Sequence, residues 1–246
     1  MIDVPEIFKQ FANVKAGQSK RTGGFSSKPF YSLNLGLSTN DEAEIIAKNR
    51  KLFFEALGAD VNYVAHSHQV HDNKILLADY PQHADGYDAI ITNKPGLFVC
   101  VTVADCTPIL IYDHKQKAVA AVHSGWKGTV AKIVTHTLNE MQKQYGTIGA
   151  DCYAYVGTCI SYESFEVGEE VASQFDKKFV RFDEYKQKYF VDLKSDNEQQ
   201  LKAFGIPPSQ IEIAKTCTVI NNEEYFSYRK EKGVTGRMLA AIGLIG

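Results

Sequence analysis

A succession of strand-like runs between residues 62 and 123 constrains the fold of this chain more than any other feature. The runs are rich in β-branched and aromatic residues, and Gly, Pro, Asn and Asp separate them, which is typical of strands joined by turns. They cover residues 62–71, 74–80, 88–92, 97–104, 108–113 and 117–123. This pattern predicts one large sheet.

Helical patterns lie on both sides of this region. Residues 41–58 place apolar side chains at helical spacing and end in Gly58, which predicts a helix. Residues 129–146 predict a second helix, whose apolar face consists of Val130, Ile133, Val134, Thr137, Leu138 and Met141. Further strands are expected at 152–157 and 211–220, and further helices at 168–179 and 195–205. We therefore predict an α/β (α+β) fold, in which residues 1–246 form a single domain and a mixed β-sheet is flanked by helices.

Charge and hydropathy argue against several kinds of partner. Lys and Arg number 27 against 29 Asp and Glu, and the net charge of -2 comes without a basic block, which is unlike a nucleic-acid-binding protein. The apolar runs are too short to cross a membrane as a helix, and the acidic start of the chain is unlike a secretory signal. We expect a cytoplasmic protein without membrane or nucleic-acid partners, and a monomer is the default expectation.

Several cysteines and histidines are not expected to belong to a functional site. The chain has 5 cysteines, an odd number, and in a reducing compartment we expect free thiols, with Cys100 and Cys152 buried among apolar residues. His83 and His114 fall in polar turns and His136 lies near the polar face of a predicted helix, so these three are expected to be solvated.

One thiol and two imidazoles stand at predicted strand ends. Cys106 follows the run 97–104, His123 ends the run 117–123, and His71 ends the run 62–71 before an Asp-Asn turn. One Cys with two His suits zinc, with copper as the main competitor. Three protein ligands leave a coordination position open, which characterises catalytic zinc. Their spacing matches no compact motif, so packing, or a nucleophile with its base, stays open.

Candidate anion ligands lie near this group and near both ends of the chain. The turn SGWKG offers Ser124, Gly125 and Lys127 between a strand and a helix N-terminus. Arg21, Arg229 and Arg237 lie in polar segments, and a guanidinium donates two parallel hydrogen bonds to phosphate or carboxylate. An exposed loop arginine is nevertheless more often solvated.

Several motifs together resemble the YfiH-type laccase-domain family. From about residue 21 to residue 237 they are, in order, TGGFSSKPFYSLNLG, QVH, TVADCTPILIYD, AAVHSGWKG, ESFEVG and FSYRKEKGVTGR. The resemblance implies a zinc site formed by His71, Cys106 and His123. It also implies an α/β sandwich similar to the fold of certain toxin deamidases, which use a Cys-His pair.

The resemblance also implies an activity. Members of this family were first called polyphenol oxidases or laccases, with copper invoked. They were later described as purine nucleoside enzymes that phosphorolyse adenosine, inosine, guanosine and methylthioadenosine and deaminate adenosine. We therefore expect a zinc-dependent purine nucleoside phosphorylase with adenosine deaminase activity, whose small-molecule partners are purine nucleosides and phosphate.

The expected catalytic residues follow from this chemistry. Phosphorolysis needs cationic donors for phosphate, for which Arg21, Lys127 and the turn 124–128 are candidates, with Arg229 as a further one. Deamination needs a group that moves a proton, for which Asp105 is the candidate. The expected catalytic set is therefore His71, Cys106, His123, Asp105 and Arg21.

The chain departs from the family pattern at three positions. Thr158 and Ser161 replace the usual proline and glycine of the loop before ESFEVG, and Asp72 replaces the usual glycine after QVH. The first two leave open whether this loop shapes a base pocket. None of the three removes a proposed ligand.

Three other functions stay open. A copper-dependent polyphenol oxidase would need more closely spaced histidines than the 7 present here. A metal-free hydrolase or deamidase would use the Cys106/His123 pair, with His71 orienting the base. A metal-binding protein without catalysis is the third.

Overall fold

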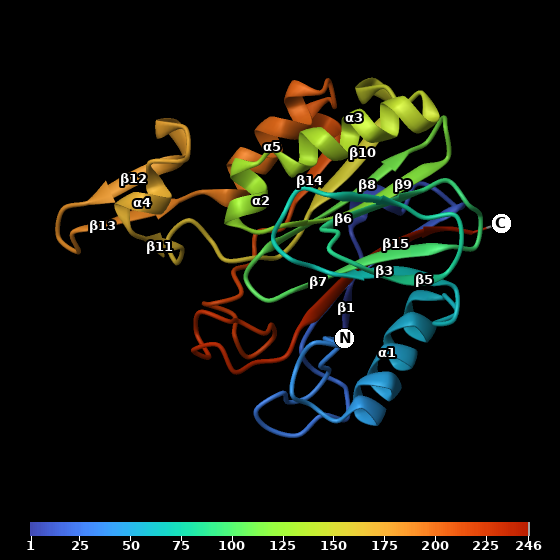
Figure 1. Ribbon diagram of the computed structural model, residues 1–246, viewed down its shortest axis with the longest axis horizontal. Coiled ribbons are helices and arrows are strands. Elements are labelled where there is room, and N and C mark those ends of the chain that lie inside the picture. Colours follow the sequence, from blue (N-terminus) through green and yellow to red (C-terminus); the bar gives the residue numbers. More distant parts are fainter. Residues whose placement is uncertain (246) are drawn as a thin grey trace.

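The computed structural model describes residues 1–245 and is built around two stacked six-stranded sheets (Figure 1). Sheet A has the strand order β1 (Ile2–Asp3), β2 (Val14–Ser19), β15 (Met238–Leu244), β7 (Phe98–Val103), β3 (Val64–His68) and β5 (Gln82–Asp85). Sheet B has the order β14 (Ile211–Ile213), β10 (Cys152–Val156), β8 (Thr107–Asp113), β9 (Ala118–Ser124), β6 (Ala89–Thr92) and β4 (Ile75–Leu77). Both sheets are mixed. In sheet A, β3 runs parallel to β5 and β7 while β15 runs antiparallel to β2 and β7. In sheet B, β10 runs parallel to β14 and antiparallel to β8.

The expectation of one large sheet is wrong, and long-range pairing is the reason. The last strand, β15, inserts between β2 and β7 and so draws β7 into sheet A. Residues 104–106 then cross directly to β8, which pairs with β9 in sheet B. The apolar runs on either side of this crossover look alike in the sequence, because both sheets are covered on both faces.

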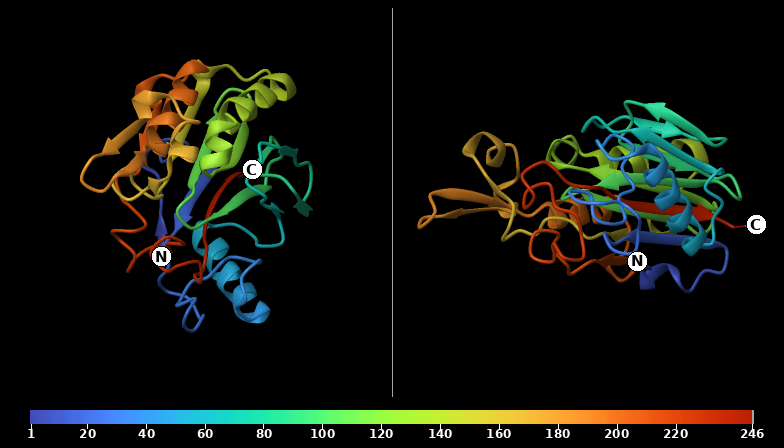
Figure 2. Two further views of the ribbon diagram at one scale, coloured as in Figure 1. Left: turned by 60° about the vertical axis from the view of Figure 1, so that its left-hand side comes forward. Right: turned by 90° about the horizontal axis from the view of Figure 1, so that it is seen from below.

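Alternating side chains separate the layers of the molecule. On β7, Val99 and Val101 pack between the sheets, whereas Phe98 and Cys100 pack with α1 (Ala43–Leu57). The same alternation directs one face of β8 toward sheet A and the other toward the helices α3 (Ile133–Tyr145) and α5 (Leu193–Ala203). Figures 1 and 2 show α1 and α3 on opposite sides of the sheets. Each fully buried aliphatic side chain contributes roughly 1.5–3 kcal/mol to this packing.

The predicted helices agree with the structure to different degrees. The helix predicted at 41–58 is α1, which ends at Gly58 in the left-handed conformation. The helix predicted at 129–146 is instead two helices, α2 (Trp126–Val130) and α3, because Lys132 adopts a left-handed conformation with φ 56°. The Lys132 amine pairs with buried Asp196 of α5, 2.9 Å away, which anchors the break.

The remaining segments form shorter elements than expected. The helix predicted at 168–179 is only α4 (Glu169–Ala172) and a 3-10 turn, η3 (Lys177–Phe179), because the Asp176 side chain caps a new turn by accepting from the Lys178 N–H. The strand predicted at 211–220 ends at Ile213, where its pairing with β10 ends. The other 3-10 turns are η1 (Glu6–Phe8), η2 (Gly149–Asp151) and η4 (Pro208–Gln210).

A small three-stranded sheet projects from the sandwich. It consists of β11 (Glu166–Val167), β13 (Lys188–Val191) and β12 (Val180–Asp183), and Figures 1 and 2 show it extending to the left of the two large sheets. None of the helices within residues 1–245 combines the length and apolar character that a membrane span requires.

Candidate metal centre

The three predicted ligands meet where the two sheets are joined. Cys106 lies in the crossover from β7 to β8, His123 lies near the end of β9, and His71 lies in the loop that follows β3. One ligand atom from each side chain lies within 4.8 Å of the others, and Cys106 Sγ is 3.8 Å from His71 Nε2. These residues are far apart along the chain, and the junction of the two sheets brings them close together in space.

The donor set fits a metal ion. A tetrahedral zinc with ordinary bond lengths would hold its sulfur and nitrogen ligands about 3.4–3.6 Å apart, close to the 3.8 Å between Cys106 Sγ and His71 Nε2. His123 Nδ1 is 2.7 Å from Asp88 Oδ1, which leaves Nε2 of the same ring for a metal. One thiol and two imidazoles suit zinc or copper, and their geometry alone does not separate the two.

A buried carboxylate that the sequence analysis did not single out organises this centre. Asp88 is fully buried; Oδ1 accepts the His71 N–H and Oδ2 accepts the N–H groups of Val70 and Asp72, at 2.9–3.1 Å. These bonds hold the loop at His71, whose φ of 62° is uncommon for a residue with a side chain. Because Asp88 also bonds the His123 ring, one carboxylate positions two of the three ligands.

The charges and burial of the residues at this centre favour an ion pair between Cys106 and His123. Burial opposes charge on Cys106, but neighbouring His123 and His71 outweigh it and lower the pKa of the thiol. Burial also opposes charge on His123, yet Cys106 and Asp88 outweigh it and raise the pKa of the imidazole. A thiolate beside an imidazolium is the consequence, and a thiolate is the form that binds a metal or acts as a nucleophile.

A cavity of about 500 Å³ opens from the metal centre. Its walls come from α1, β3, β5, β7 and the loop before β15, and they include Arg50, His66, His83 and Arg237. His83 was expected to be solvated in a turn, but it belongs to β5, where its ring lies 4.4 Å from that of His66. Its side chain is exposed on the cavity side of the sheet edge.

The predicted anion turn lies beside the metal centre without lining the cavity. Gly125 is the N-cap of α2, and a Cβ at this position would lie 3.0 Å from Cys106 Sγ and from His71 Cδ2. Ser124 is buried and hydrogen-bonded to Thr129 and Asn197. Lys127 is exposed, its amine lies over the Trp126 ring, and it is not among the residues that line the cavity. Gly125 therefore makes room for the ligands, and Ser124 ties β9 to the helices.

Asp105 and Arg229 both lie at the cavity. Asp105 precedes Cys106 with a φ of 80°, and its two oxygens accept from the Thr218 hydroxyl and the Arg229 N–H, each at 2.6 Å. The Arg229 side chain is exposed and lies over the Phe165 ring. Both oxygens of Asp105 are therefore held in place, and the Arg229 guanidinium lies at the rim of the cavity.

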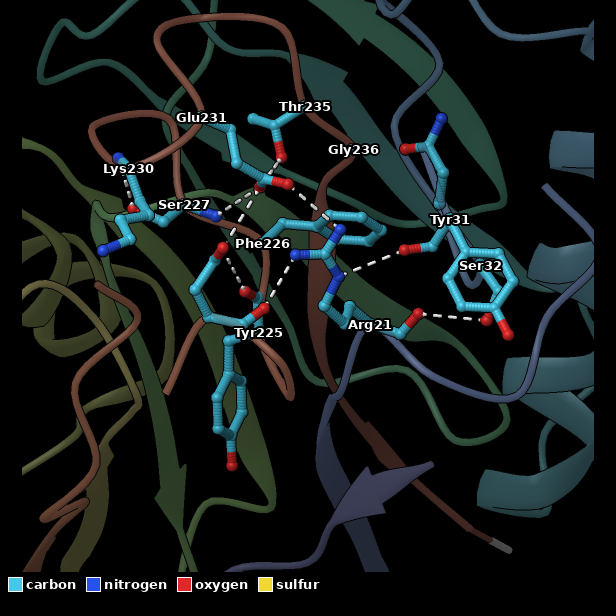
Figure 3. Close-up of polar contacts among 12 residues, drawn as sticks. Arg21, Tyr31, Ser32, Tyr225, Phe226, Ser227, Lys230, Glu231, Thr235 and Gly236 are labelled. Carbon is cyan, nitrogen blue, oxygen red and sulfur yellow. Dashed lines mark hydrogen bonds and ion pairs between the residues drawn. The ribbon is translucent and has the colours of Figure 1, made fainter. Parts of the chain in front are cut away.

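Arg21 lies outside the cavity in a contact of its own (Figure 3). Its guanidinium donates to the carbonyls of Tyr31 and Asn222 and to Glu231, and it stacks on Phe226 at 4.5 Å. Glu231 also accepts from Ser227 N and Thr235 Oγ1, as Figure 3 shows. Because all three side-chain nitrogens donate to the protein, Arg21 is not placed to bind phosphate in the cavity.

Comparisons with known proteins agree over almost the whole chain. A family model described as multi-copper polyphenol oxidoreductase laccase matches residues 15–245. The chain belongs to this laccase family. A protein of Bacteroides thetaiotaomicron named purine nucleoside phosphorylase is 38% identical over 96% of this chain and 94% of its own. The purine nucleoside phosphorylase YfiH of Escherichia coli K12 is 35% identical over 98% of both chains.

A solved laccase-family structure confirms the fold. The crystal structure of the hypothetical protein YfiH of Bacillus licheniformis superposes with a TM-score of 0.92 at 30% identity and covers 99% of this chain and 96% of its own. The resemblance inferred from the motifs is therefore confirmed. The family description names several coppers. Within residues 1–245, however, only one group of three or more clustered metal donors is present, formed by His71, Cys106 and His123.

The positions at which this chain departs from the laccase-family pattern have structural partners. The Thr158 N–H donates to the Gln18 side chain at 2.8 Å, which returns a bond to the Thr158 carbonyl. The Ser161 N–H donates to Cys217 Sγ. Asp72 keeps the backbone bond to Asp88, and its side chain is exposed. Between the first two, Ile160 lines the cavity, so this loop does contribute to its wall.

Proposed function

We propose that this protein is a metal-dependent purine nucleoside phosphorylase that acts on adenosine, inosine, guanosine and methylthioadenosine. The observation that carries the proposal is the metal-ligand trio His71, Cys106 and His123 opening into one cavity of about 500 Å³. This volume falls within the roughly 300–1,000 Å³ of small-molecule sites. The names of relatives at 38% and 35% identity over nearly their full length support the same activity.

Zinc is the proposed metal. One thiolate with two neutral imidazoles is a donor set found in catalytic zinc sites, and the cavity leaves an approach to the ion open. When bound, the ion would supply Lewis acidity beside the substrate. The residues of the chain itself would then bind and orient the nucleoside.

The cavity offers chemically distinct contacts for a nucleoside. The aromatic residues Phe165 and Tyr228 line it and supply ring faces for a purine. Asp105, fixed by two hydrogen bonds beside Cys106, is placed to accept a proton during the proposed deamination of adenosine. In phosphorolysis, a phosphate oxygen forms the bond to C1′ of the ribose as the bond to the purine nitrogen breaks, so cationic groups must hold the phosphate.

Chromatography of adenosine incubated with the metal-quantified protein tests this function. We expect adenine and ribose 1-phosphate only with phosphate, inosine without it, and loss of both products in Cys106→Ala. Cys152→Ala is the matched control, because this buried cysteine lies on the face of sheet B that packs against the helices. Adenosine that remains unchanged at full metal occupancy would exclude the proposed activity.

A thiol hydrolase or deamidase is the second candidate, favoured by one observation. A ring nitrogen of His123 lies within 4.8 Å of Cys106 Sγ, and His123 Nδ1 lies 2.7 Å from Asp88 Oδ1, which is the order of groups in a Cys-His-Asp arrangement. A thiol hydrolase or deamidase should hydrolyse amides even after a chelator has removed metal ions, and it should lose this activity when Cys106 is alkylated. Turnover that requires added metal would instead support the metal-dependent function.

A further inference from the structure

Arg50, which the sequence analysis did not single out, and Arg237, which it named as a candidate anion ligand, both line the cavity. Arg50 lies on α1 and is only 6% exposed, and Arg237 immediately precedes β15. Both are attached to the segment 34–36: Arg50 Nη1 donates to the Leu35 carbonyl at 3.1 Å, and the Arg237 N–H donates to Asn34 Oδ1 at 2.9 Å. A Cβ on Gly36 would lie 2.6 Å from Arg237 Cγ, so the backbone lies directly against that side chain.

The Arg50 side chain is buried and that of Arg237 is half-buried, and neither is paired with a described acidic side chain. Within residues 1–245, Arg50 donates to the Leu35 carbonyl, and Arg237 donates through Nη1 to the carbonyls of Thr235 and Gly236. No ion pair forms at either of them in the described chain, unlike Arg21, which pairs with Glu231. Burying a charge without a counter-charge is costly, so the buried Arg50 guanidinium, with half-buried Arg237 at the same wall, favours a bound anion.

The charge of the residues that line the cavity also favours an anionic ligand. Three arginines and one acidic residue, Asp105, line it, although the whole chain has a net charge of -2. Asp105 accepts from Thr218 and the Arg229 backbone and forms no ion pair with a described arginine, so positive charge is in excess at the cavity. A positive wall in an acidic chain selects an anionic ligand.

We propose that Arg50 and Arg237 bind the tetrahedral oxyanion inorganic phosphate in this cavity. The identity of the anion rests on the proposed phosphorolysis. Each guanidinium directs Nη1 to backbone carbonyls and can offer its remaining N–H groups to phosphate oxygens as parallel donors. The proposal replaces Arg21, which is engaged by the protein, and Lys127, which lies outside the cavity.

One neighbour, His66, also fits a phosphate at this wall. Burial, followed by the charges of Arg50 and His83, lowers the pKa of His66 to about 4, so its ring is neutral at pH 7 and can both donate and accept a hydrogen bond. Arg237 and His66 line the same cavity as Cys106. The proposed anion site therefore adjoins the metal centre within one cavity.

Calorimetric titration of the metal-loaded protein with inorganic phosphate, at constant ionic strength set by chloride, tests the site. We expect Arg237→Gln and Arg50→Gln each to weaken phosphate binding by about tenfold or more, and Arg237→Lys to weaken it less because the charge remains. Arg181→Gln is the matched control, since Arg181 lies on β12 outside the cavity. If Arg50→Gln fails to fold, Arg237→Gln and Arg237→Lys decide the outcome.

Kinetics separate this site from the proposed function. The KM for phosphate should rise by about tenfold in Arg237→Gln while the KM for the nucleoside stays within about twofold. Phosphate binding that depends on Arg237, in a protein without phosphorolysis, would keep the anion site and overturn the proposed function. Phosphate that does not bind the wild type, or binds Arg237→Gln as tightly, would overturn the site.

Discussion

At the scale of single residues, Asp88 is the group on which the metal centre most depends. It fixes the His123 ring and accepts from three successive backbone N–H groups around His71. An amide in its place would direct an NH₂ group at donors that now meet a carboxylate oxygen. We predict that Asp88→Asn weakens zinc binding by roughly 10–100-fold, measured by competition with a chromogenic chelator. Asp85→Asn is the control, because Asp85 is an exposed acid bonded to His68, and equal affinities in both variants would contradict the prediction.

Gly125 tests whether close packing around the ligands matters. Its φ of -71° and ψ of 174° suit any residue, but an added Cβ would lie 3.0 Å from Cys106 Sγ and His71 Cδ2. We predict that Gly125→Ala keeps the fold and lowers turnover by about tenfold or more, because small displacements of ligands are costly. In Gly128→Ala, the nearest atom would be at an ordinary 3.4 Å, so its turnover should change little. Similar rates for the two variants would show that the ligands tolerate the displacement.

His66 should make stability depend on pH. Its pKa is lowered to about 4 in the folded protein, chiefly by burial, from an ordinary value of 6.5. Between these pH values the unfolded chain binds more protons, so the folded state loses stability as the pH falls through this window. We predict that His66→Gln flattens the fall in urea-unfolding free energy between pH 6.5 and 4. His136→Gln, at an exposed helix position, should retain the wild-type slope.

The ligand residues could be anticipated from the sequence more readily than the groups that hold them. Cys106 and His123 follow apolar runs, and their residue types alone suggest a metal. Asp88 is 17 residues from His71 and 35 from His123, and it looks like an ordinary acid at the start of a strand. Its burial arises only when β6 pairs with β9, which brings its carboxylate under the His123 ring.

At the scale of elements, the loop between residues 221 and 237 depends on Arg21 and Glu231 for its position. This loop carries Tyr228, Arg229 and Arg237 to the cavity. Arg21, from the other end of the chain, links it to the Tyr31 carbonyl and packs on Phe226 (Figure 3). Arg21 therefore acts as a positioning residue.

Loss of this contact should loosen the loop without removing a ligand. We predict that Arg21→Met lowers the free energy of unfolding by about 2 kcal/mol and raises the KM for phosphate, since Arg237 would be less well held. Arg21→Lys should recover part of the stability, because an amine can still pair with Glu231. Chemical denaturation and steady-state kinetics measure the two effects. A variant with wild-type stability but no turnover would instead place Arg21 in the chemistry.

Local patterns predicted elements that depend on neighbouring residues and missed those that depend on distant ones. The apolar spacing and Gly58 located α1 because a helix closes its bonds within four residues. The division into two sheets depends on β15, whose small side chains carry a weak strand pattern and whose partners lie more than 130 residues away at β7. The local periodicity of apolar residues does not indicate which strands pair at that separation along the chain.

At the scale of the whole molecule, the metal centre joins the two sheets. His71 follows β3 of sheet A, Cys106 lies in the crossover, and His123 belongs to sheet B. An ion bound by all three would hold the sheets together, and it binds the folded state because the unfolded chain does not assemble the trio. The centre should therefore contribute to stability as well as to catalysis.

Metal dependence of unfolding tests this coupling. Free zinc at a hundredfold excess over its Kd stabilises a folded protein by about 2.7 kcal/mol, which for a chain of this size corresponds to a rise in Tm of about 5–11 °C. We predict this rise in the wild type and in Cys152→Ala, and its loss in Cys106→Ala, measured by calorimetry with and without a chelator. A similar rise in Cys106→Ala would mean that zinc binds elsewhere on the folded chain, and the three residues would then have to act without metal, as the Cys-His-Asp arrangement of Cys106, His123 and Asp88 allows.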